Sequence, residues 1–194
     1  MDILNNSERY HGSMIKNILL LGITAVFAIG LLTQSASAAS VDYFLKIDGV
    51  PGESTDDKHK GWIEIESFSW GASQSSATSG GGGAGKVSIS DFSFTSSASK
   101  ASPKLFEHVV TGKHIKDVTL QLCVAGEGRE SQCYLDIVLS DVLVSSYQSQ
   151  GSSGEQPTEQ LSLNFSKIEF KYQPIGSSEA PVKAGYDLKK NVKV

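Results

Sequence analysis

Cys123 and Cys133 are the two cysteines of the chain and its candidates for covalent chemistry. They lie in the segment LQLCVAGEGRESQCYLDI, at equal distances from Gly128. If residues 118–124 and 133–139 pair as a hairpin, the two Cβ atoms face each other closely enough for a disulfide. If the protein is exported, its oxidising surroundings favour that disulfide. Without export, the two cysteines would act as small apolar side chains. No second pair of ligands has metal spacing, so the sequence does not predict a zinc site.

A run of charged residues follows the first expected strand. Burying so many charges is costly, so this run is expected to form a surface loop. Three interpretations stay open: a solvated loop, a metal or recognition site, or the complementary charge of a contact between subunits. The candidates for this assembly loop are Glu53, Asp56, Asp57, Lys58, His59 and Lys60.

Neither the other histidines nor the glycine-rich tract forms a recognisable catalytic motif. His108 lies on an expected helix and His114 just beyond it, so they could share a ligand only if the end of the helix folds back. The tract from Gly80 to Lys86 matches G-x-x-x-x-G-K, but Val87 follows where a phosphate loop needs Ser or Thr. With no G-x-S-x-G or H-E-x-x-H motif either, the sequence predicts no enzyme and no cofactor.

Alternating polar and apolar residues predict that β-strands position these groups. Apolar side chains switch faces near Asp91 and again near Ser166 and Lys167, which predicts a bulge at each place. Long strands with such switches suit a closed or nearly closed barrel. The expected strands cover residues 43–47, 62–70, 87–94, 117–124, 133–147 and 159–173.

One short helix is expected over residues 102–111. Ser102 is its predicted N-cap, Pro103 its first helical residue and Gly112 its stop. A helix of this length is not stable alone in water, so it must pack on the sheet. Its predicted apolar side comprises Leu105, Phe106, Val109 and Val110.

The first 38 residues have the pattern of a secretory signal peptide. Lys16 precedes an apolar run at 18–32, and Ala36-Ser37-Ala38 fits the small-residue rule for cleavage between Ala38 and Ala39. Translation could start at Met1 or at Met14. The alternative is a single membrane anchor, for which the apolar run is short. The predicted organisation is a signal peptide at 1–38 and one domain at 39–194.

The charge of the chain argues against a nucleic-acid partner. The net charge is −4, and charges of both signs are interspersed along the chain. Phosphates would need a basic stripe, which is missing from this sequence. No polybasic cluster predicts a role at a membrane surface, so no membrane partner is expected for the mature form.

Five segments resemble the Hcp (haemolysin-coregulated protein) family, whose members form the tube of the bacterial type VI secretion system. Such long motifs, in one order and at compatible spacing, are much more specific than a short pattern. The segments are FLKIDGVPGESTDDKHKGWIEIESFSWG at 44–71, GKVSISDFSFT at 85–95, KASPKLFEHVVTGKHI at 100–115, SLNFSKIEFKY at 162–172 and AGYDLKKNVKV at 184–194.

The resemblance implies a mainly β fold, namely an Hcp-like β-barrel of two antiparallel sheets with one short α-helix. It also implies a structural protein that forms hexameric rings, which stack into a tube and carry effectors. The expected partners are further copies of the chain, secreted effector proteins and other type VI secretion components.

The apparent signal peptide departs from this family pattern. Tube proteins of this family assemble in the cytoplasm and leave through their own machine. The alternative is therefore a Sec-exported periplasmic or extracellular ring or binding protein on the same fold. The expected location is secreted or periplasmic, or cytoplasmic before secretion if the chain is a true tube subunit.

Overall fold

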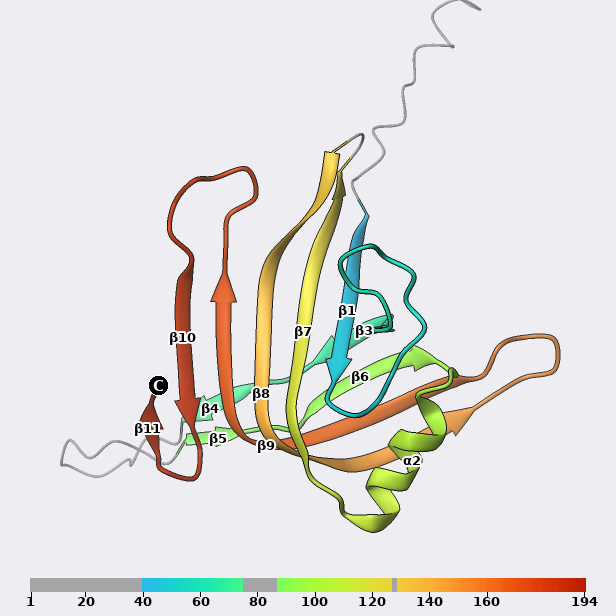
Figure 1. The fold of residues 1–194 in the computed structure, drawn as a ribbon. Coiled ribbons are helices and arrows are strands. Elements are labelled where there is room, and N and C mark those ends of the chain that lie inside the picture. The colour runs from blue at the N-terminus through green and yellow to red at the C-terminus, as the bar shows by residue number, and fades with distance from the viewer. Residues whose placement is uncertain (1–39, 75–86, 127–128) are drawn as a thin grey trace, which may run out of the picture. The chain divides into compact units, whose positions relative to one another are not determined.

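The computed structural model describes residues 40–74, 87–126 and 129–194, all within the unit Ala39–Val194. The expected signal peptide with its cleavage site at Ala38 and Ala39, the tract Gly80 to Lys86 and Gly128 lie outside the described residues. The elements, labelled as in Figure 1, are β1 (Val41–Ile47), β2 (Ile63–Glu64), β3 (Ser67–Ser69), β4 (Ala72–Gln74), β5 (Val87–Ile89), β6 (Phe92–Ser97), α2 (Ser102–Thr111), β7 (Ile115–Gly126), β8 (Arg129–Gln150), β9 (Thr158–Tyr172), β10 (Val182–Asp187) and β11 (Val192–Lys193).

The strands form two antiparallel sheets. The larger sheet has the order β11-β10-β9-β8-β7-β1-β2, and β4 and β5 form a separate two-stranded sheet. The strand β9 pairs with β8 along its length, and its first half also pairs with β6, which in turn pairs with β3. Figure 1 shows this half of β9 crossing below the upright strands with β6.

A short connection between β2 and β3 closes the ring of strands. The backbone N–H of Ile65 donates to the carbonyl of Tyr43 in β1, and the N–H of Glu66 donates to Thr95 in β6. The chain thus passes from one side of the barrel to the other within these two residues. The predicted fold class, a mainly β barrel of two antiparallel sheets with a short helix, is confirmed.

The core lies between the upright strands and the crossing layer. Paired residues of antiparallel strands share a face, so the register places apolar rows across the sheet. One row is Leu45, Leu120, Ile137 and Phe170, and the first three of these are 0–1% exposed. From the other layer, Phe92 and Phe94 of β6 lie opposite Leu163 and Leu161 of β9, and all four are fully buried.

Of the two predicted bulges, the structure confirms the one at Asp91 and not the one at Ser166 and Lys167. β5 ends at Ile89 and β6 begins at Phe92, so the chain bends at Asp91 as predicted. The buried face of β9 also switches after Phe165, but the register with β8 continues there without a shift. The bulge predicted at Ser166 and Lys167 is wrong, because the register shift lies in β8, between Val144 and Ser146.

The helix α2 covers the predicted residues, but its start differs. Ala101 is the N-cap, so Ser102 lies inside the helix, where its hydroxyl donates to Glu159 Oε2 at 2.8 Å. This buried carboxylate competes with the helix for the Ser102 hydroxyl. Gly112 ends the helix with φ 64°, as expected. Leu105 is buried, whereas Phe106 and Val110 are 52% and 62% exposed, so the predicted apolar side is too wide.

In the parts of the chain that the structure describes, no helix is long and apolar enough to cross a membrane.

Candidate functional site

The charged run lies in a loop, residues 48–62, that folds back onto the sheet beside β1. Its backbone is closed by hydrogen bonds from Gly52 N–H to Gly61 O, at 2.8 Å, and from Ser54 N–H to Trp62 O, at 2.9 Å. A Cβ on Gly52 would lie 2.1 Å from the carbonyl oxygen of Trp62, so only glycine fits this approach. The loop therefore holds a defined conformation.

His59 is the buried member of the charged run. Its side chain is 2% exposed, and its ring stacks on Phe44 with centroids 4.1 Å apart. The edge of the same ring meets Trp62, with the centroids 4.9 Å apart. His59 thus packs into the sheet, and the interpretation of the run as wholly solvated is wrong for this residue.

Asp56 positions the His59 ring. Its Oδ1 atom lies 2.5 Å from His59 Nδ1 and accepts the backbone N–H groups of Lys58 and His59, at 3.0 and 2.9 Å. Burial acts to raise the pKa of Asp56, but these hydrogen bonds and the His59 ring outweigh it and hold the pKa below its usual value. The Asp56 carboxylate is therefore the favoured acceptor for the Nδ1 proton.

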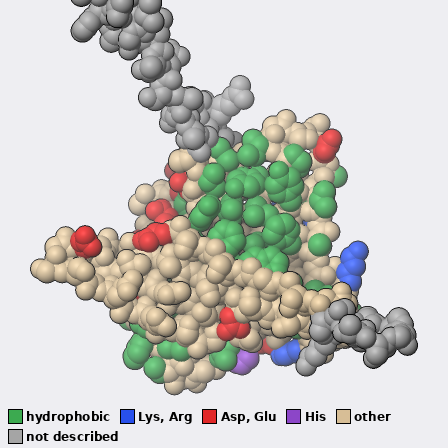
Figure 2. Space-filling view, turned by 180° about the vertical axis from the view of Figure 1, so that it is seen from behind, with side chains coloured by type: hydrophobic (Ala, Val, Ile, Leu, Met, Phe, Trp, Pro, Cys, Tyr) green, Lys and Arg blue, Asp and Glu red, His purple; other side chains and the backbone are tan. Residues whose placement is uncertain are grey.

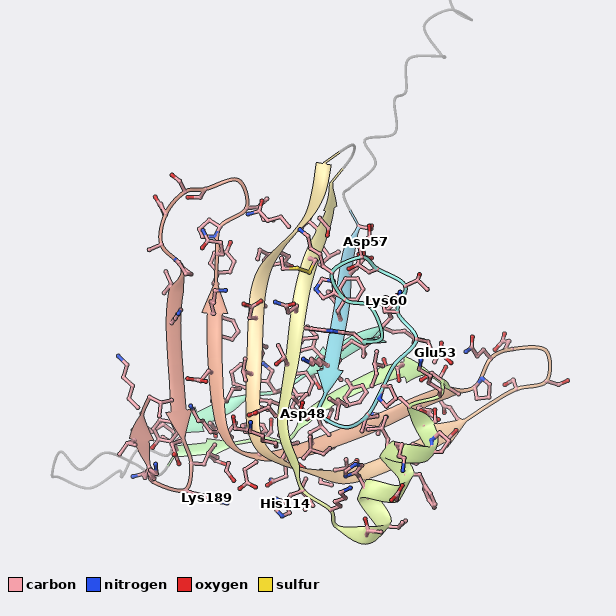
Figure 3. All side chains as sticks on the ribbon, in the orientation of Figure 1. Asp48, Glu53, Asp57, Lys60, His114 and Lys189 are labelled. Carbon is pink, nitrogen blue, oxygen red and sulfur yellow. A yellow bond between two sulfur atoms is a disulfide. The ribbon has the colours of Figure 1, made fainter. Side chains whose placement is uncertain are left out.

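The other charged residues of the run lie on the surface. Glu53, Asp57 and Lys60 are exposed, and Figure 3 shows them along the outside of the loop. Lys58 is exposed as well, and its Nζ donates to the carbonyl of Ser131 in β8, at 3.0 Å. The side chains of Glu53, Asp57 and Lys60 are thus exposed at the rim of the barrel.

The structure joins Cys123 and Cys133 by a disulfide between β7 and β8. The two sulfurs lie 3.8 and 3.7 Å from His59 Nε2. Sequence spacing gave no signal of this contact, because His59 comes from a loop far away in the chain. Only the pairing of Asp42 in β1 with Cys123 in β7 brings the loop beside the cysteines.

A polar row continues from His59 across the outer face of the sheet. His59 Nε2 lies 3.0 Å from Gln121 Oε1, and Gln121 Nε2 donates to Asp136 Oδ1 at 2.9 Å. Asp136 in turn accepts a hydrogen bond from Lys171 Nζ at 2.8 Å. This network connects the loop to β7, β8 and β9.

A second cluster of charge surrounds Asp141 at the other end of the strands. Its carboxylate accepts from Lys189 Nζ, from Ser166 Oγ at 2.7 Å and from His114 Nδ1 at 2.8 Å. The hydrogen bond from Lys189, followed by those from Ser166 and His114, holds the pKa of Asp141 well below its usual range. Figure 3 shows His114 and Lys189 near this end, opposite the end that carries Asp57.

His108 and His114 do not meet. His108 is buried at 6% exposure and its Nδ1 donates to the carbonyl of Lys113, whereas His114 is exposed and contacts Asp141. A pair of ordinary surface or capping histidines is the commoner arrangement for such a spacing, and His108 departs from it because it is buried. Among the described residues, the grouping of His, Cys and acidic side chains able to hold a metal ion is His59, Cys123 and Cys133.

The inner face of the upright sheet carries an apolar row that the second layer leaves partly uncovered. The register aligns Tyr43, Leu122, Leu135, Tyr172 and Val182 across five strands. Leu122 is buried, but Tyr172 is 43% and Val182 69% exposed. In Figure 2 many hydrophobic side chains gather into a large patch on the surface of the molecule, and a smaller group lies apart from it. We call these five residues the apolar row.

The two edges of the larger sheet differ in charge. A groove of about 620 Å³ beside β1 and β2 is lined by four carboxylates, those of Asp42, Asp56, Glu64 and Glu66. The opposite edge, formed by β10, β11 and the turn between them, carries lysines at 183, 189, 190 and 193. One side of the barrel is thus acidic and the other basic.

A family model described as "Type VI secretion system effector, Hcp" matches residues 44–172, from β1 to the end of β9. The chain belongs to the Hcp family. The matched range includes the loop at 48–62, both cysteines and most of the barrel.

Individual Hcp proteins resemble the chain over most of its length. Protein hcp1 of Pseudomonas aeruginosa is 42% identical over 160 residues, which cover 79% of this chain and 98% of that protein. Hcp1 from Salmonella typhimurium has a similar structure, with 35% identity and a TM-score of 0.69, covering 81% of this chain and all of that one. A type VI secretion system effector from Yersinia pestis has 32% identity and a TM-score of 0.62, covering 75% of this chain and 99% of that one.

Proposed function

We propose that this Hcp protein is a structural subunit whose copies form hexameric rings, and that these rings stack into a tube that carries effector proteins. The observation that carries the proposal is the apolar row. A soluble domain gains free energy by burying such a surface against another protein. A neighbouring copy of the chain is the occupant that the family favours.

The opposite charges of the two sheet edges support a ring over a two-fold dimer. A ring requires that two different surfaces of each copy meet head to tail. The acidic groove at β1 and β2 and the basic edge at β10 and β11 are complementary, which favours this contact and disfavours pairing of like edges. The exposed charges of the loop at 48–62 are candidates for contacts between stacked rings.

Substitution of Val182 by glutamate tests the assembly. Val182 is exposed, so Val182→Glu should change the stability of one copy by less than about 0.5 kcal/mol while placing a charge in the contact. Light scattering of the purified full chain should show a hexamer for the unchanged protein and smaller species for Val182→Glu.

Val110→Glu is the matched control, because Val110 is similarly exposed but lies on α2, away from the apolar row. It should leave the assembly intact. The proposal would be contradicted if the unchanged protein stayed monomeric at high concentration, or if the Val182→Glu variant still formed rings.

The second candidate function is a Sec-exported ring or binding protein outside the cytoplasm. The disulfide favours it, because such bonds persist in oxidising compartments. Mass spectrometry of the protein recovered from cells separates the two candidates. An N-terminus at Ala39 would support export, whereas an intact start at Met1 or Met14 in cytoplasmic protein would support tube assembly.

A further inference from the structure

Three side chains with metal-binding atoms converge on the outer face of the barrel. The sulfurs of Cys123 and Cys133 and the Nε2 atom of His59 all lie within 4.8 Å of one another. His59 and Cys123 are 2% and 1% exposed, so the group lies under the loop and not on the open surface.

The distances from His59 Nε2 to the two sulfurs are close to those of a zinc site, whereas the disulfide must be reduced and the sulfurs must separate before both can bind a metal ion. Tetrahedral zinc has bonds of about 2.0 Å to nitrogen and 2.3 Å to sulfur, which places a nitrogen and a sulfur ligand about 3.6 Å apart. His59 Nε2 lies 3.8 Å from one sulfur and 3.7 Å from the other. The nitrogen is therefore close to the distance from each sulfur that a shared metal ion would require.

The neighbours of His59 hold its ring in the way that is usual for a metal-binding histidine. In metal sites, the second ring nitrogen of a ligating histidine usually donates to a carboxylate, which fixes the tautomer and the orientation of the ring. Asp56 Oδ1 lies 2.5 Å from His59 Nδ1, and the stacking on Phe44 holds the plane of the ring. Gln121 Oε1, 3.0 Å from Nε2, is an oxygen within reach of a fourth position.

We propose that the chain with reduced cysteines binds one Zn²⁺ ion through Cys123 Sγ, Cys133 Sγ and His59 Nε2. The disulfide and the zinc ion are then alternative cross-links between β7 and β8. The first belongs to oxidising compartments and the second to reducing ones. This site is independent of the proposed ring assembly.

The exchange between the two forms is balanced. An external dithiol supplies two electrons and two protons to the disulfide and is itself oxidised to a disulfide. Zinc then binds the two sulfurs as thiolates, so both thiol protons leave for the solvent. His59 binds through the lone pair of Nε2, so any proton that this nitrogen shares with Gln121 also leaves. The Nδ1 proton stays with Asp56.

Cobalt binding by the full chain tests the site, because tetrahedral Co²⁺ with thiolate ligands has intense visible and near-ultraviolet bands. The protein is reduced with a phosphine, desalted without oxygen and titrated with Co²⁺ alone, and then with Zn²⁺. The expected result is one Co²⁺ per chain with the thiolate bands, displaced by Zn²⁺. The oxidised protein should give no such bands.

Variants assign the ligands. Cys133→Ser and His59→Gln should each weaken Co²⁺ binding at least tenfold and reduce the thiolate bands or alter the band pattern. Asp56→Asn, which removes a positioning residue, should weaken binding about 10–100-fold and keep the thiolate bands. His114→Gln is the matched control, because His114 also contacts an aspartate but lies far from the cysteines, and it should bind normally.

Thermal unfolding of the unchanged protein provides a second test of zinc binding, which does not depend on the stability of the variants. Zn²⁺ should raise the unfolding temperature of the reduced, unchanged protein and leave that of the oxidised protein the same. Reduced protein that stays folded without thiolate bands or a zinc-dependent shift would overturn the proposal. So would full cobalt affinity in folded His59→Gln.

Discussion

At the scale of single residues, one aspartate determines how the loop meets the sheet. Asp56 accepts hydrogen bonds from the His59 ring and from two backbone N–H groups. It therefore both stabilises the turn of the loop and orients the buried histidine. Hydrogen bonds to a charged acceptor contribute about 1.5–3 kcal/mol each before solvent screening is considered. Because Asp56 is partly exposed, its total contribution is expected at the lower end of this range.

Asp56→Asn should therefore lower the free energy of unfolding by about 1–2 kcal/mol at pH 7. The pKa of Asp56 is lower in the folded protein than in the unfolded chain. The stabilisation is thus fully present above the unfolded value of about 4 and is lost as the pH falls through the folded value. Urea unfolding at several pH values should show the variant and the unchanged protein converging below about pH 4.

Asp57→Asn is the control for this measurement. Asp57 is the exposed neighbour in the same loop, so its substitution should change stability by less than about 0.5 kcal/mol. A constant difference between Asp56→Asn and the unchanged protein down to pH 2 would contradict the assigned role of the carboxylate.

Local patterns in the sequence predicted much of the fold at the scale of elements, since alternation and turn residues depend on near neighbours. The strands, the bend at Asp91 and the stop at Gly112 follow from such patterns. The wrong cap at Ser102 and the missed burial of His108 have a different origin, because partners from other elements decide both. His59 is the clearest case, since its neighbours at Phe44, Gln121 and Cys123 become visible only when the strands pair.

A buried carboxylate links α2, β8 and β9 and makes a second prediction. Glu159 is 3% exposed and accepts hydrogen bonds from Tyr147 OH, at 2.6 Å, and from Ser102 Oγ, at 2.8 Å. Tyr147→Phe removes one donor and should cost about 1–3 kcal/mol of stability, measured by urea unfolding at neutral pH. Tyr186→Phe is the control, because the Tyr186 hydroxyl pairs with Asn191 at an exposed site, and it should cost less.

Tyr147 also predicts a loss of stability in alkali. Burial, followed by the hydrogen bond to Glu159, raises the pKa of Tyr147 to about 12. Because the folded value is above the unfolded one, the stabilisation is present below about pH 10 and is lost as the pH rises through 12. The Tyr147→Phe protein should therefore show a weaker loss of stability between pH 9 and 12 than the unchanged protein. Equal losses in the two proteins would contradict the prediction.

The backbone of the loop makes a third prediction. Gly52→Ala would place a Cβ against the Trp62 carbonyl and must displace the loop, with the loss of its hydrogen bonds and of His59 packing. Gly49→Ala has open space around the new Cβ but a φ of 79°, so it should cost only about 1–2 kcal/mol. Unfolding experiments should show Gly52→Ala as clearly the more destabilised of the two, and equal losses would refute the steric argument.

At the scale of the whole molecule, the barrel places different chemistry on its sides. The apolar row lies on the inner face of the upright sheet, the His59 network lies on the outer face, and the acidic and basic edges lie at the two ends of the strand order. This separation allows a ring contact and a buried metal or disulfide site to exist in one small domain. From the sequence, assembly was predicted through the family resemblance and, as one of three interpretations, through the charged run at 53–60. The two charged edges could not be predicted, because only the folded sheet brings their residues together.

Exchange of charge between the two edges tests the head-to-tail contact directly. Glu64 lines the acidic groove and Lys183 lies on β10, and both are exposed. Glu64→Lys and Lys183→Glu should each weaken the ring, because each places like charges in contact. The combined variant should recover part of the assembly, since the contact regains one pair of opposite charges.

Sedimentation at low and high salt should show that the single variants assemble better as salt screens the repulsion. Lys116→Glu reverses an exposed charge on β7, away from both edges, and should assemble normally. A double variant as weak as the sum of its parts, with no effect of salt, would show that these two edges do not meet in the ring.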